Sequence, residues 1–495
     1  MKHSFQSAHH CLISEFNNMR KVITFLFSLF FCLDMYQCRP TNEVLTELPN
    51  IILCMADDQG WGDMGYNGHR VIQTPNFDDM AAEALRFDRF YAAAPVCSPT
   101  RGSVMTGRHP NRFACFSWGY TLRPQEITIA EVLKRAGYVT GHFGKWHLGS
   151  VRQGSPVNPG AVGFDKWFSA PNFFDNNPIL SLEGIAMQTE GESSMVAINA
   201  ALEFIRKHEG RKKPYFVVVW FGSPHLPHKA YEEDRKLYCD QPDDLEHFYG
   251  EISGMDRAFG KLRAELKKLS TYKNTILWYC SDNGGLPRVG STGGRGHKGD
   301  VYEGGLRVPA IMEWPAKIKE SRITQLPAST SDIFLTLLDI VGLQVDASRP
   351  YDGISLVPLL DGQIDNRTQP MGFWHYPASG IPTPSAEWMT ELLESQKNGN
   401  MVGDSSRLRL EDIKIKTQYP LDTLKGHAAW LDWPWKLHRI YKKSGDIQWE
   451  LYRLDEDPQE SLNQLNREPE RVSKMKMALE EWQRSVVRSM NGGDY

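Results

Sequence analysis

Three short apolar runs, each ending abruptly in polar residues, constrain the fold of this chain more than any other feature. The runs cover residues 51–55, 215–220 and 275–280, and none contains a charged side chain. Segments with helical spacing lie between them, and such alternation predicts βαβ units with a mostly parallel sheet and helices on both faces. Residues 428–440 and 448–454 instead indicate antiparallel strands around a turn. We therefore expect an α/β fold with a large, mostly parallel sheet, followed by a smaller C-terminal α+β domain that carries an antiparallel sheet.

The length of 495 residues exceeds what one hydrophobic core usually supports, so we expect more than one domain. The expected division is a leader over residues 1–40, a site-bearing α/β domain over residues 48–368 and the smaller domain over residues 369–495. Residues 150–192 are rich in Gly, Pro and Asn and indicate long surface loops. The segments expected to be helical are 77–90, 125–136, 196–207, 245–269, 331–341 and 468–490.

The start of the chain differs from the rest. Met19-Arg20-Lys21 precedes the apolar stretch 22–33, which is too short to span a membrane but suits the core of a signal peptide. We therefore expect an exported protein, periplasmic or secreted, without stable insertion into a membrane. A lipid anchor on Cys38 is the less favoured alternative, because Met35-Tyr36-Gln37 matches a lipoprotein cleavage site poorly.

The charge and the cysteines exclude several functional classes. A formal net charge of −4 provides no basic surface for nucleic acid, so no nucleic-acid partner is expected. The cysteines beyond the leader show neither the spacing of a disulfide scaffold nor that of a zinc cluster. Their odd number leaves one for other chemistry, and they are Cys54, Cys97, Cys115, Cys239 and Cys280.

Polar side chains follow all three apolar runs at their C-terminal ends. Open α/β sheets place their sites at the carboxyl ends of the strands, so these side chains are expected to converge. They are Asp57 and Asp58, His225, and Asp282 and Asn283. Adjacent buried carboxylates repel each other, and a cation is their natural compensation. Carboxylate and amide oxygens without Cys or His suit Ca²⁺, or less well Mg²⁺, so a metal site is favoured over a solvated Asp-Asp turn.

The run Cys97-Ser98-Pro99-Thr100-Arg101 indicates the start of a helix. Proline is tolerated in the first helical turn, and Arg101 then lies one turn beyond Cys97 on the same face. Cys97 is thereby expected at a helix N-terminus, where backbone N–H groups favour an anion.

A glycine-rich stretch from Gly284 to Gly305 indicates a flexible loop that delivers Lys298 over the site. A dinucleotide-binding interpretation of its glycines is discounted, because no helix follows directly. Zinc binding by His225 and His228 is likewise disfavoured, since no third ligand is evident. We also expect Glu303 and Arg307 to form a supporting ion pair.

The pattern C-x-P-x-R-x-x-x-x-T-G from Cys97 to Gly107 resembles the signature of the formylglycine-dependent (type I) sulfatases, which have an alkaline-phosphatase-like fold. Gly137-Tyr138-Val139-Thr140 through Gly144-Lys145-Trp146-His147 is similar to the second signature of that family. The resemblance covers about residues 50–309, and the sequence as a whole is similar to those of arylsulfatases and N-acetylgalactosamine-6-sulfatases. It implies that a formylglycine-generating enzyme oxidises Cys97 to formylglycine, the hydrate of which offers a hydroxyl nucleophile beside the metal.

The resemblance also implies roles for individual residues. Cys97, in its modified form, would share the Ca²⁺ with Asp57, Asp58, Asp282 and Asn283. Arg101 would hold the hydrate and the ligand carboxylates, Lys145 would bind the sulfate and His147 would contact the second hydroxyl. His225 and Lys298 would lie on the side of the leaving group. The expected function is hydrolysis of a sulfuric ester of a carbohydrate or an aryl alcohol.

Two other functions remain open from the residues alone. The same metal and charges would suit a phosphate or phosphonate monoester hydrolase, although that branch normally uses Thr or Ser as nucleophile. A non-catalytic carbohydrate-binding protein would leave Cys97 unmodified. Aromatic residues near the C-terminus fit either sugar subsites or the core of the smaller domain, and they are Trp374, His375, Tyr376, Trp430, Trp433 and Trp435.

Overall fold

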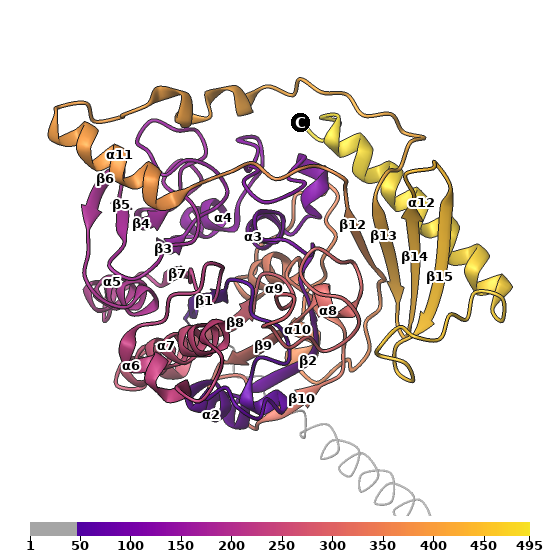
Figure 1. The fold of residues 1–495 in the computed structure, drawn as a ribbon, viewed down its shortest axis with the longest axis horizontal. Coiled ribbons are helices and arrows are strands. Elements are labelled where there is room, and N and C mark those ends of the chain that lie inside the picture. The colour runs from indigo at the N-terminus through magenta and orange to yellow at the C-terminus, as the bar shows by residue number, and fades with distance from the viewer. Residues whose placement is uncertain (1–46) are drawn as a thin grey trace, which may run out of the picture. The chain divides into compact units, whose positions relative to one another are not determined.

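The computed structural model describes residues 47–495, so the leader expected over residues 1–40, with Cys38, lies outside the described residues. Eleven strands within the described part form one large sheet: β1 (Asn50–Ala56), β2 (Leu85–Tyr91), β3 (Val139–Lys145), β4 (Lys166–Ala170), β5 (Ile179–Leu182), β6 (Ile185–Gln188), β7 (Tyr215–Trp220), β8 (Thr275–Ser281), β9 (Arg307–Glu313), β10 (Arg322–Thr324) and β11 (Ala328–Ser329). Their order is β10-β2-β9-β8-β1-β7-β3-β4-β5-β6, with β11 beside β2 (Figure 1).

The centre of this sheet is parallel. β1 lies between β7 and β8 and runs parallel to both, and β3 pairs in parallel with β7 and β4. Antiparallel pairs join β9 to β8 and to β2, and they also add β5 and β6 at the other edge. The expected α/β sheet is therefore confirmed as a large mixed sheet with a parallel centre.

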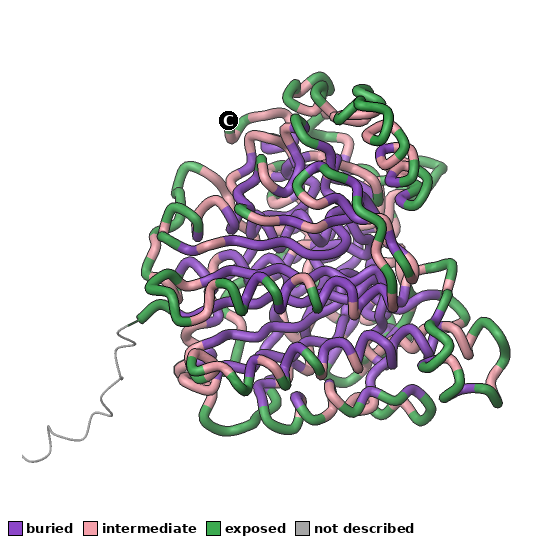
Figure 2. Tube along the Cα trace, turned by 90° about the vertical axis from the view of Figure 1, so that its left-hand side faces the viewer, coloured by how far each residue is buried: buried purple, intermediate pink, exposed green. Residues whose placement is uncertain are grey.

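Helices cover both faces of the large sheet, and the burial pattern of β1 shows why. Successive strand side chains point to opposite faces. Ile51 and Leu53 belong to the core beneath α3, α4 and α9, whereas Ile52 and Cys54 belong to the core beneath α2, α5 and α7. Both cores are continuous buried layers in Figure 2. The helices are α2 (Pro75–Glu83), α3 (Cys97–Thr106), α4 (Ile129–Arg135), α5 (Ser193–His208), α6 (Glu232–Arg235), α7 (Asp243–Leu266), α8 (Glu303–Leu306), α9 (Asp332–Ile340), α10 (Val357–Leu360), α11 (Ser385–Lys397) and α12 (Pro469–Met490).

Three sequence-based expectations of local structure are wrong. The helix expected over residues 77–90 is α2 followed directly by β2, because a short apolar run fits either period. The stretch 150–192 contains β4, β5 and β6 rather than loops alone. The strand expected over residues 428–440 is divided by a turn at Trp433-Pro434 into β13 (His427–Asp432) and β14 (Trp435–Tyr441).

A separate four-stranded antiparallel sheet lies near the C-terminus, as expected. It has the order β12-β13-β14-β15, where β12 is Met371–His375 and β15 is Ile447–Arg453. The C-terminal helix α12 crosses one face of this sheet (Figure 1) and contacts β13 and β14. Trp374 is buried under α12, so the core interpretation of this tryptophan is correct.

The connection between β12 and β13 is long, and we call residues 376–426 the crossover segment. It leaves the small sheet and returns to the opposite edge of the large sheet, where α11 contacts β5 and β6 (Figure 1). Within the described residues, no helix is long and apolar enough to cross a membrane.

Candidate active site

The carboxyl ends of β1, β3, β7 and β8 meet at one buried cluster of charged side chains. Asp57 and Asp58 follow β1, Lys145 ends β3, and Asp282 follows β8. All four are fully buried, with 0% relative exposure. Parallel strands that share one sheet direct their carboxyl ends to the same edge, which explains the convergence.

Asp57 is held between two cationic side chains. Lys145 donates a hydrogen bond from Nζ to Asp57 Oδ2 over 2.6 Å, and Arg101 Nη2 lies 3.3 Å from Asp57 Oδ1. Arg101 also donates to Asp282 Oδ2 over 2.7 Å, so one guanidinium bridges carboxylates from two strands. Its guanidinium carbon lies 5.1 Å from the ring centroid of Trp220, the last residue of β7.

Asp58 is the most connected carboxylate of the cluster. Its backbone adopts a φ of 73°, and its N–H donates to Asp282 Oδ1 over 3.0 Å. Asn283 Nδ2 donates to Oδ1 over 2.9 Å, and Lys298 Nζ donates to Oδ2 over 2.6 Å. The glycine-rich loop therefore brings Lys298 to the end of β1, where the sequence placed it.

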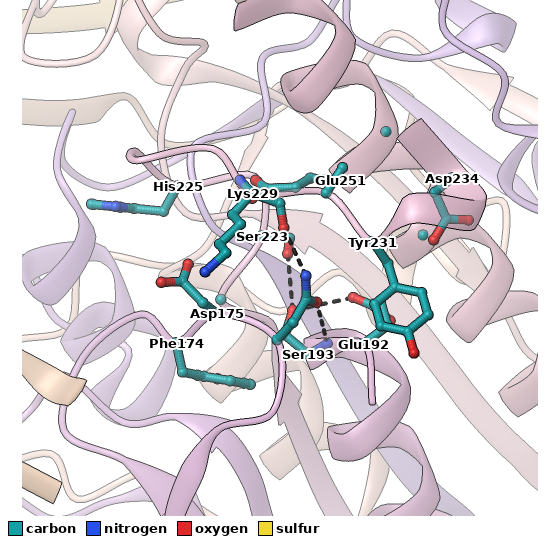
Figure 3. A pocket seen from close by; sticks show the side chains of 15 residues that line it. Phe174, Asp175, Glu192, Ser193, Ser223, His225, Lys229, Tyr231, Asp234 and Glu251 are labelled. Carbon is teal, nitrogen blue, oxygen red and sulfur yellow. Dashed lines mark hydrogen bonds between the residues drawn. The ribbon is translucent and has the colours of Figure 1, made fainter. Parts of the chain in front are cut away.

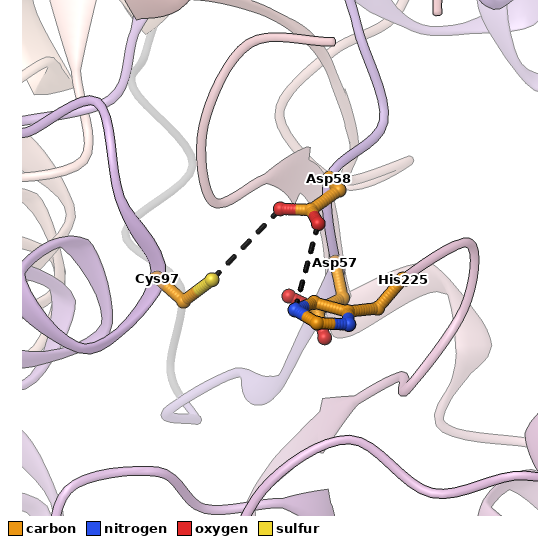
Figure 4. A group of neighbouring side chains, drawn as sticks. All are labelled: Asp57, Asp58, Cys97 and His225. Atoms are coloured by element: carbon orange, nitrogen blue, oxygen red, sulfur yellow. Dashed lines mark hydrogen bonds and ion pairs between the residues drawn. The ribbon is translucent and has the colours of Figure 1, made fainter. Parts of the chain in front are cut away.

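Cys97 lies at the first residue of α3 and faces Asp58. Its Sγ is 3.8 Å from Asp58 Oδ1 (Figure 4), and Cys97 as a whole is 1% exposed. Burial raises the pKa of the Cys97 thiol above its ordinary value, more than Lys145 and Lys298 lower it. The unmodified side chain is thus a neutral thiol at neutral pH rather than the anion that the helix N-terminus alone would favour.

His147 and His225 lie on two sides of the cluster. His147 is 3% exposed, and neither of its ring nitrogens has a hydrogen-bond partner among the described residues. His225 Nε2 lies 3.6 Å from Asp58 Oδ2 (Figure 4), while its Nδ1 contacts the carbonyl oxygen of Leu226 at 2.6 Å. The His225 ring stacks on Phe173 with centroids 4.3 Å apart.

Burial lowers the pKa of both histidines, and nearby cations add to this effect. The pKa of His225 falls to about 3, because burial outweighs the attraction of Asp58. The pKa of His147 lies well below its ordinary value, first through burial and then through Lys145 and Arg101. Burial raises the pKa of Asp282 to about 6, although Arg101 opposes the shift. In the protein without an ion, both rings are therefore neutral at pH 7.

A small polar pocket lies behind His225 and is lined by acidic side chains (Figure 3). Asp234 pairs with Arg257 over 2.7 Å, and Glu192 accepts hydrogen bonds from the backbone N–H groups at the start of α5. Burial raises the pKa of Glu251 to about 7, while a hydrogen bond with His228 opposes the rise. Carboxylates therefore predominate on this side of the active site, and Lys229 and Arg257 offset part of their charge.

The donor set of the cluster fits a hard divalent cation. Asn283 Oδ1 is buried and accepts no hydrogen bond within the described part of the chain, and Asp57 Oδ1 has only the 3.3 Å ion pair with Arg101. Ligand atoms of Asp57, Asp58, Cys97 and His225 all lie within 4.8 Å of one another. Three carboxylates face three cationic side chains, so a divalent ion would leave a net positive site suited to an anion.

One smaller expectation about side chains is wrong, and the zinc alternative that the sequence disfavours gains no support among the described residues. Glu303 pairs with Lys436 over 2.9 Å and Arg307 pairs with Asp88 over 3.0 Å, so they do not pair with each other. Glu303 begins α8 and Arg307 begins β9, which directs the two side chains to different neighbours. His228 faces Glu251 at 3.5 Å and is absent from the possible metal group that contains His225, when the described residues are searched.

Sequence reasoning missed the aromatic supports of the site. Trp220 lies under Arg101, and Phe173 lies under His225. Trp220 closes an apolar run and was assigned only to a strand, whereas Phe173 lies in a stretch assigned to loops. The position of Trp220 directly before the polar end of β7 was the available signal.

The fold and this charged cluster define a hydrolase of anionic esters. A sequence model of the sulfatase family matches residues 49–343. N-acetylgalactosamine-6-sulfatase from Canis lupus familiaris is 34% identical over 363 residues, which cover 64% of this chain and 67% of that protein. Arylsulfatase G from the same organism is 32% identical over 399 residues, which cover 69% of this chain and 72% of that protein.

The structure of Ps i-CgsB in complex with k-i-k-neocarrahexaose has the same fold. It superimposes with a TM-score of 0.74 at 23% identity, covering 89% of this chain and 93% of that chain. The chain belongs to the sulfatase family, and the resemblance of its two signatures to that family is confirmed. It is a sulfatase, an enzyme that hydrolyses sulfate esters.

Proposed function

We propose that this sulfatase removes sulfate from a sulfated carbohydrate or aryl alcohol, with Cys97 converted to formylglycine and a Ca²⁺ ion held at the strand ends. The observation that carries the proposal is the position of Cys97, which begins α3 with Sγ 3.8 Å from Asp58 Oδ1. A residue placed there faces three carboxylates and three cationic side chains at once. Asp57, Asp58, Asp282 and Asn283 would hold the ion, because they supply buried oxygen atoms.

The formylglycine at position 97 and the bound Ca²⁺ would contribute different parts of the chemistry. The hydrated aldehyde supplies one hydroxyl as a nucleophile toward sulfur and a second through which sulfate is released, and Ca²⁺ supplies positive charge against the sulfate oxygens. A serine or threonine has no second hydroxyl, which is the chemical reason for a modified cysteine.

The side chains of the chain itself neutralise and orient the substrate. Lys145 pairs with Asp57 and Lys298 pairs with Asp58, so two ammonium groups lie where sulfate oxygens would gain negative charge in the transition state. Arg101 holds Asp57 and Asp282 in fixed positions through its bridge. Lys298, at the partly exposed edge of the cluster, has a proton on Nζ that it can donate to the departing alkoxide.

His147 and His225 flank the nucleophile position. His147 is neutral and has no described hydrogen-bond partner, so it can accept the proton of the second hydroxyl when sulfate is released. His225 Nε2 lies near Asp58 on the side that opens to solvent, which supports a role beside the leaving group. These are the roles that the family resemblance implies, and the distances support them.

The name of the canine relative supports a carbohydrate substrate, since that protein is an N-acetylgalactosamine-6-sulfatase. We further propose that the chain is matured by a formylglycine-generating enzyme and exported. The division into a catalytic domain over residues 48–368 and a smaller domain over residues 369–495 is also part of this proposal.

Turnover of two aryl esters tests the proposal. Protein from a host that contains the maturation enzyme is assayed with 4-nitrocatechol sulfate and with 4-nitrophenyl phosphate, in the presence of Ca²⁺. We expect sulfate release that exceeds phosphate release and that Cys97→Ala abolishes, while the exposed Cys239→Ser retains it. Phosphate release above sulfate release would instead identify a phosphomonoesterase, and sulfate release by Cys97→Ala would refute the proposed nucleophile.

A further inference from the structure

A second pocket adjoins the active site on the side of His147. Its volume is about 300 Å³, which is within the size range of small-ligand sites. Its lining combines Thr121 and His147 from the large-sheet domain with Trp388, Arg407 and Arg409 from the crossover segment. One wall of the pocket therefore comes from residues far from the sulfatase signatures in the sequence.

The crossover segment is attached to the loops around Cys97. Ile381 N–H donates to the carbonyl oxygen of Trp118 over 2.9 Å, and Asn172 Nδ2 donates to the carbonyl oxygen of Thr383 over 3.1 Å. Gly119, next to Trp118, donates its N–H to Ser98 Oγ over 3.0 Å. The wall is thus connected through two hydrogen bonds to the residue that follows Cys97.

Carboxylates hold the two arginines of this wall from outside the pocket. Arg407 pairs with Glu391 and, over 3.3 Å, with Asp404, and Arg409 pairs through Nε with Asp412 over 3.2 Å. The arginines line the pocket, whereas none of these three carboxylates is among its described lining residues. Arg407 is paired with two carboxylates, whereas the ion pair of Arg409 runs through Nε and leaves its Nη groups available to a ligand.

Two further features indicate a shaped binding surface. The guanidinium of Arg407 lies over the ring of Trp388, 4.7 Å from its centroid, which fixes an aromatic ring in the wall. Arg409 has a φ of 62°, in the left-handed region that side chains other than glycine rarely adopt. Such backbone conformations cluster at ligand sites because the surrounding structure must impose them.

The pocket behind His225 has the opposite character. Its volume is only about 10 Å³, and Asp175, Glu192, Lys229 and Glu251 are among its lining residues (Figure 3), so it has no room for a second anionic group. In the proposed function, the sugar that carries the departing oxygen lies beside His225 and Lys298, so the pocket beside His147 is the space available to a second anionic group of the substrate.

We propose that the pocket formed by Trp388, Arg407 and Arg409 binds a second anionic group of the substrate, a sulfate or a carboxylate on the sugar next to the one that loses its sulfate. This inference rests on the proposed sulfatase function and makes the enzyme selective for polyanionic glycans. Arg409 contributes charge to the pocket, and Trp388 contacts the apolar face of a sugar ring.

Kinetics with substrates of increasing charge test the inference. The probes are N-acetylgalactosamine 6-sulfate, its disaccharide with a neighbouring uronic acid, and the same disaccharide with an added sulfate on the uronic acid. Arg409→Ala is expected to lower kcat/KM for both disaccharides by about tenfold, mainly through KM, relative to the monosaccharide. Arg409→Lys should recover part of the loss, because it restores the charge without the planar guanidinium.

Arg471→Ala is the matched control. Arg471 pairs through Nε with Glu468 over 3.2 Å at i,i+3 spacing, as Arg409 does with Asp412, but it lies on α12 outside the pocket. An equal loss for all three probes, or no loss for any, would overturn the proposal. A loss with both disaccharides identifies the carboxylate as the bound group, and a loss confined to the disaccharide with the added sulfate identifies that sulfate.

A binding measurement keeps this inference separate from the proposed function. Calorimetry compares Cys97→Ala with the double variant Cys97→Ala/Arg409→Ala, using hexasaccharides of chondroitin sulfate, heparan sulfate and ι-carrageenan. We expect the double variant to bind at least one of them about tenfold more weakly. Equal affinities, or binding to neither variant, would refute the pocket even if the wild type is an active sulfatase. A difference in affinity, together with a wild-type protein that hydrolyses no sulfate ester, would instead refute only the proposed function.

Discussion

The two sides of the substrate site are built in different ways. The floor, at the strand ends, is completely buried and its charges neutralise one another through short ion pairs; its members are Asp57, Asp58, Cys97, Arg101, Lys145, Asp282 and Asn283. The wall consists of Trp388, Arg407 and Arg409 of the crossover segment, and it is partly exposed. Arg407 has a side-chain exposure of 20% and Arg409 one of 32%.

This difference indicates that the floor carries out the reaction and that the wall selects the substrate. A buried floor in a low-dielectric environment gives each charge a strong effect on the sulfate, and it cannot change without a cost in stability. A partly exposed wall contributes less to stability and can vary with the substrate. Substitutions in the floor should therefore affect every substrate, and changes in the wall should affect only the extended ones.

Arg101→Ala should give the largest loss of stability and activity, because it removes the bridge between two carboxylates of the floor. Without the guanidinium, Asp57 and Asp282 become buried carboxylates that lack their shared partner, which costs about 3–5 kcal/mol of unfolding free energy. We expect urea unfolding at lower concentration and loss of sulfatase activity in the protein that remains folded.

The control for Arg101 is a second buried arginine. Arg263 pairs with Glu313 over 2.7 Å beside the start of β8, at the edge of the sheet opposite the active site, and Arg263→Ala should cost similar stability while it retains activity per folded molecule. A folded, fully active Arg101→Ala enzyme would show that the bridge between Asp57 and Asp282 has no function.

Lys145→Ala should reduce kcat/KM by about 10²- to 10³-fold, as the removal of one preorganised charge does in other enzymes. The loss should be equal for aryl sulfates and oligosaccharides, since both present the same sulfate to the floor. Steady-state kinetics with both substrates checks this expectation. A loss confined to oligosaccharides would assign Lys145 to the wall instead of the floor.

Removal of the metal should lower both activity and thermal stability. A ligand that binds only the folded state stabilises it by about 3–4 kcal/mol at 100 to 1,000 times its dissociation constant. After chelation and dialysis, we expect a lower Tm and little turnover, with Ca²⁺ restoring both better than Mg²⁺. Full activity in protein shown to be metal-free by elemental analysis would contradict a cation at the floor.

Gly380→Ala should change the wall alone. A Cβ at this position would lie 1.9 Å from Cε2 of the Trp118 ring, so that ring or the crossover segment must shift. We expect kcat/KM for sulfated oligosaccharides to fall several-fold while that for 4-nitrocatechol sulfate is retained. The same reduction for both substrates would mean that floor and wall are mechanically coupled.

Glu251→Gln should have the smallest effect, a change in the pH dependence of stability. Burial, with Asp175 nearby, raises the pKa of Glu251 from 4.5 to about 7, and His228 opposes the shift. Between these pH values the unfolded chain releases a proton that the folded protein keeps, so stability falls as pH rises. We expect Glu251→Gln to reduce the fall in Tm between pH 5 and pH 8 by a few degrees. An unchanged pH profile would show that Glu251 is ionised in the folded protein.

The floor could be predicted from the sequence, but the wall could not. Asp57, His225 and Asp282 each follow an uncharged apolar run, and the common direction of parallel strands brings such positions together. Trp388 lies on α11, but nothing in its local sequence indicates that α11 packs against β5 and β6, and Arg409 lies in an irregular polar stretch beyond that helix. Non-local packing of this kind leaves no local pattern in the chain.

The same limit explains the errors in local structure. β2 follows α2 after a single residue, and the apolar spacing of residues 77–90 fits a helix throughout. Pairing with β9 decides that Leu85–Tyr91 is a strand, and this partner is more than two hundred residues away in the sequence.

Mass spectrometry of the peptide that contains Cys97 tests the central claim most directly. Protein from a host with the maturation enzyme is digested, and the mass of residue 97 is compared with that from a host without it. The account predicts that sulfatase activity rises in proportion to the fraction of peptide in which an aldehyde replaces the thiol. Full activity in protein whose Cys97 is entirely an unmodified thiol would contradict it.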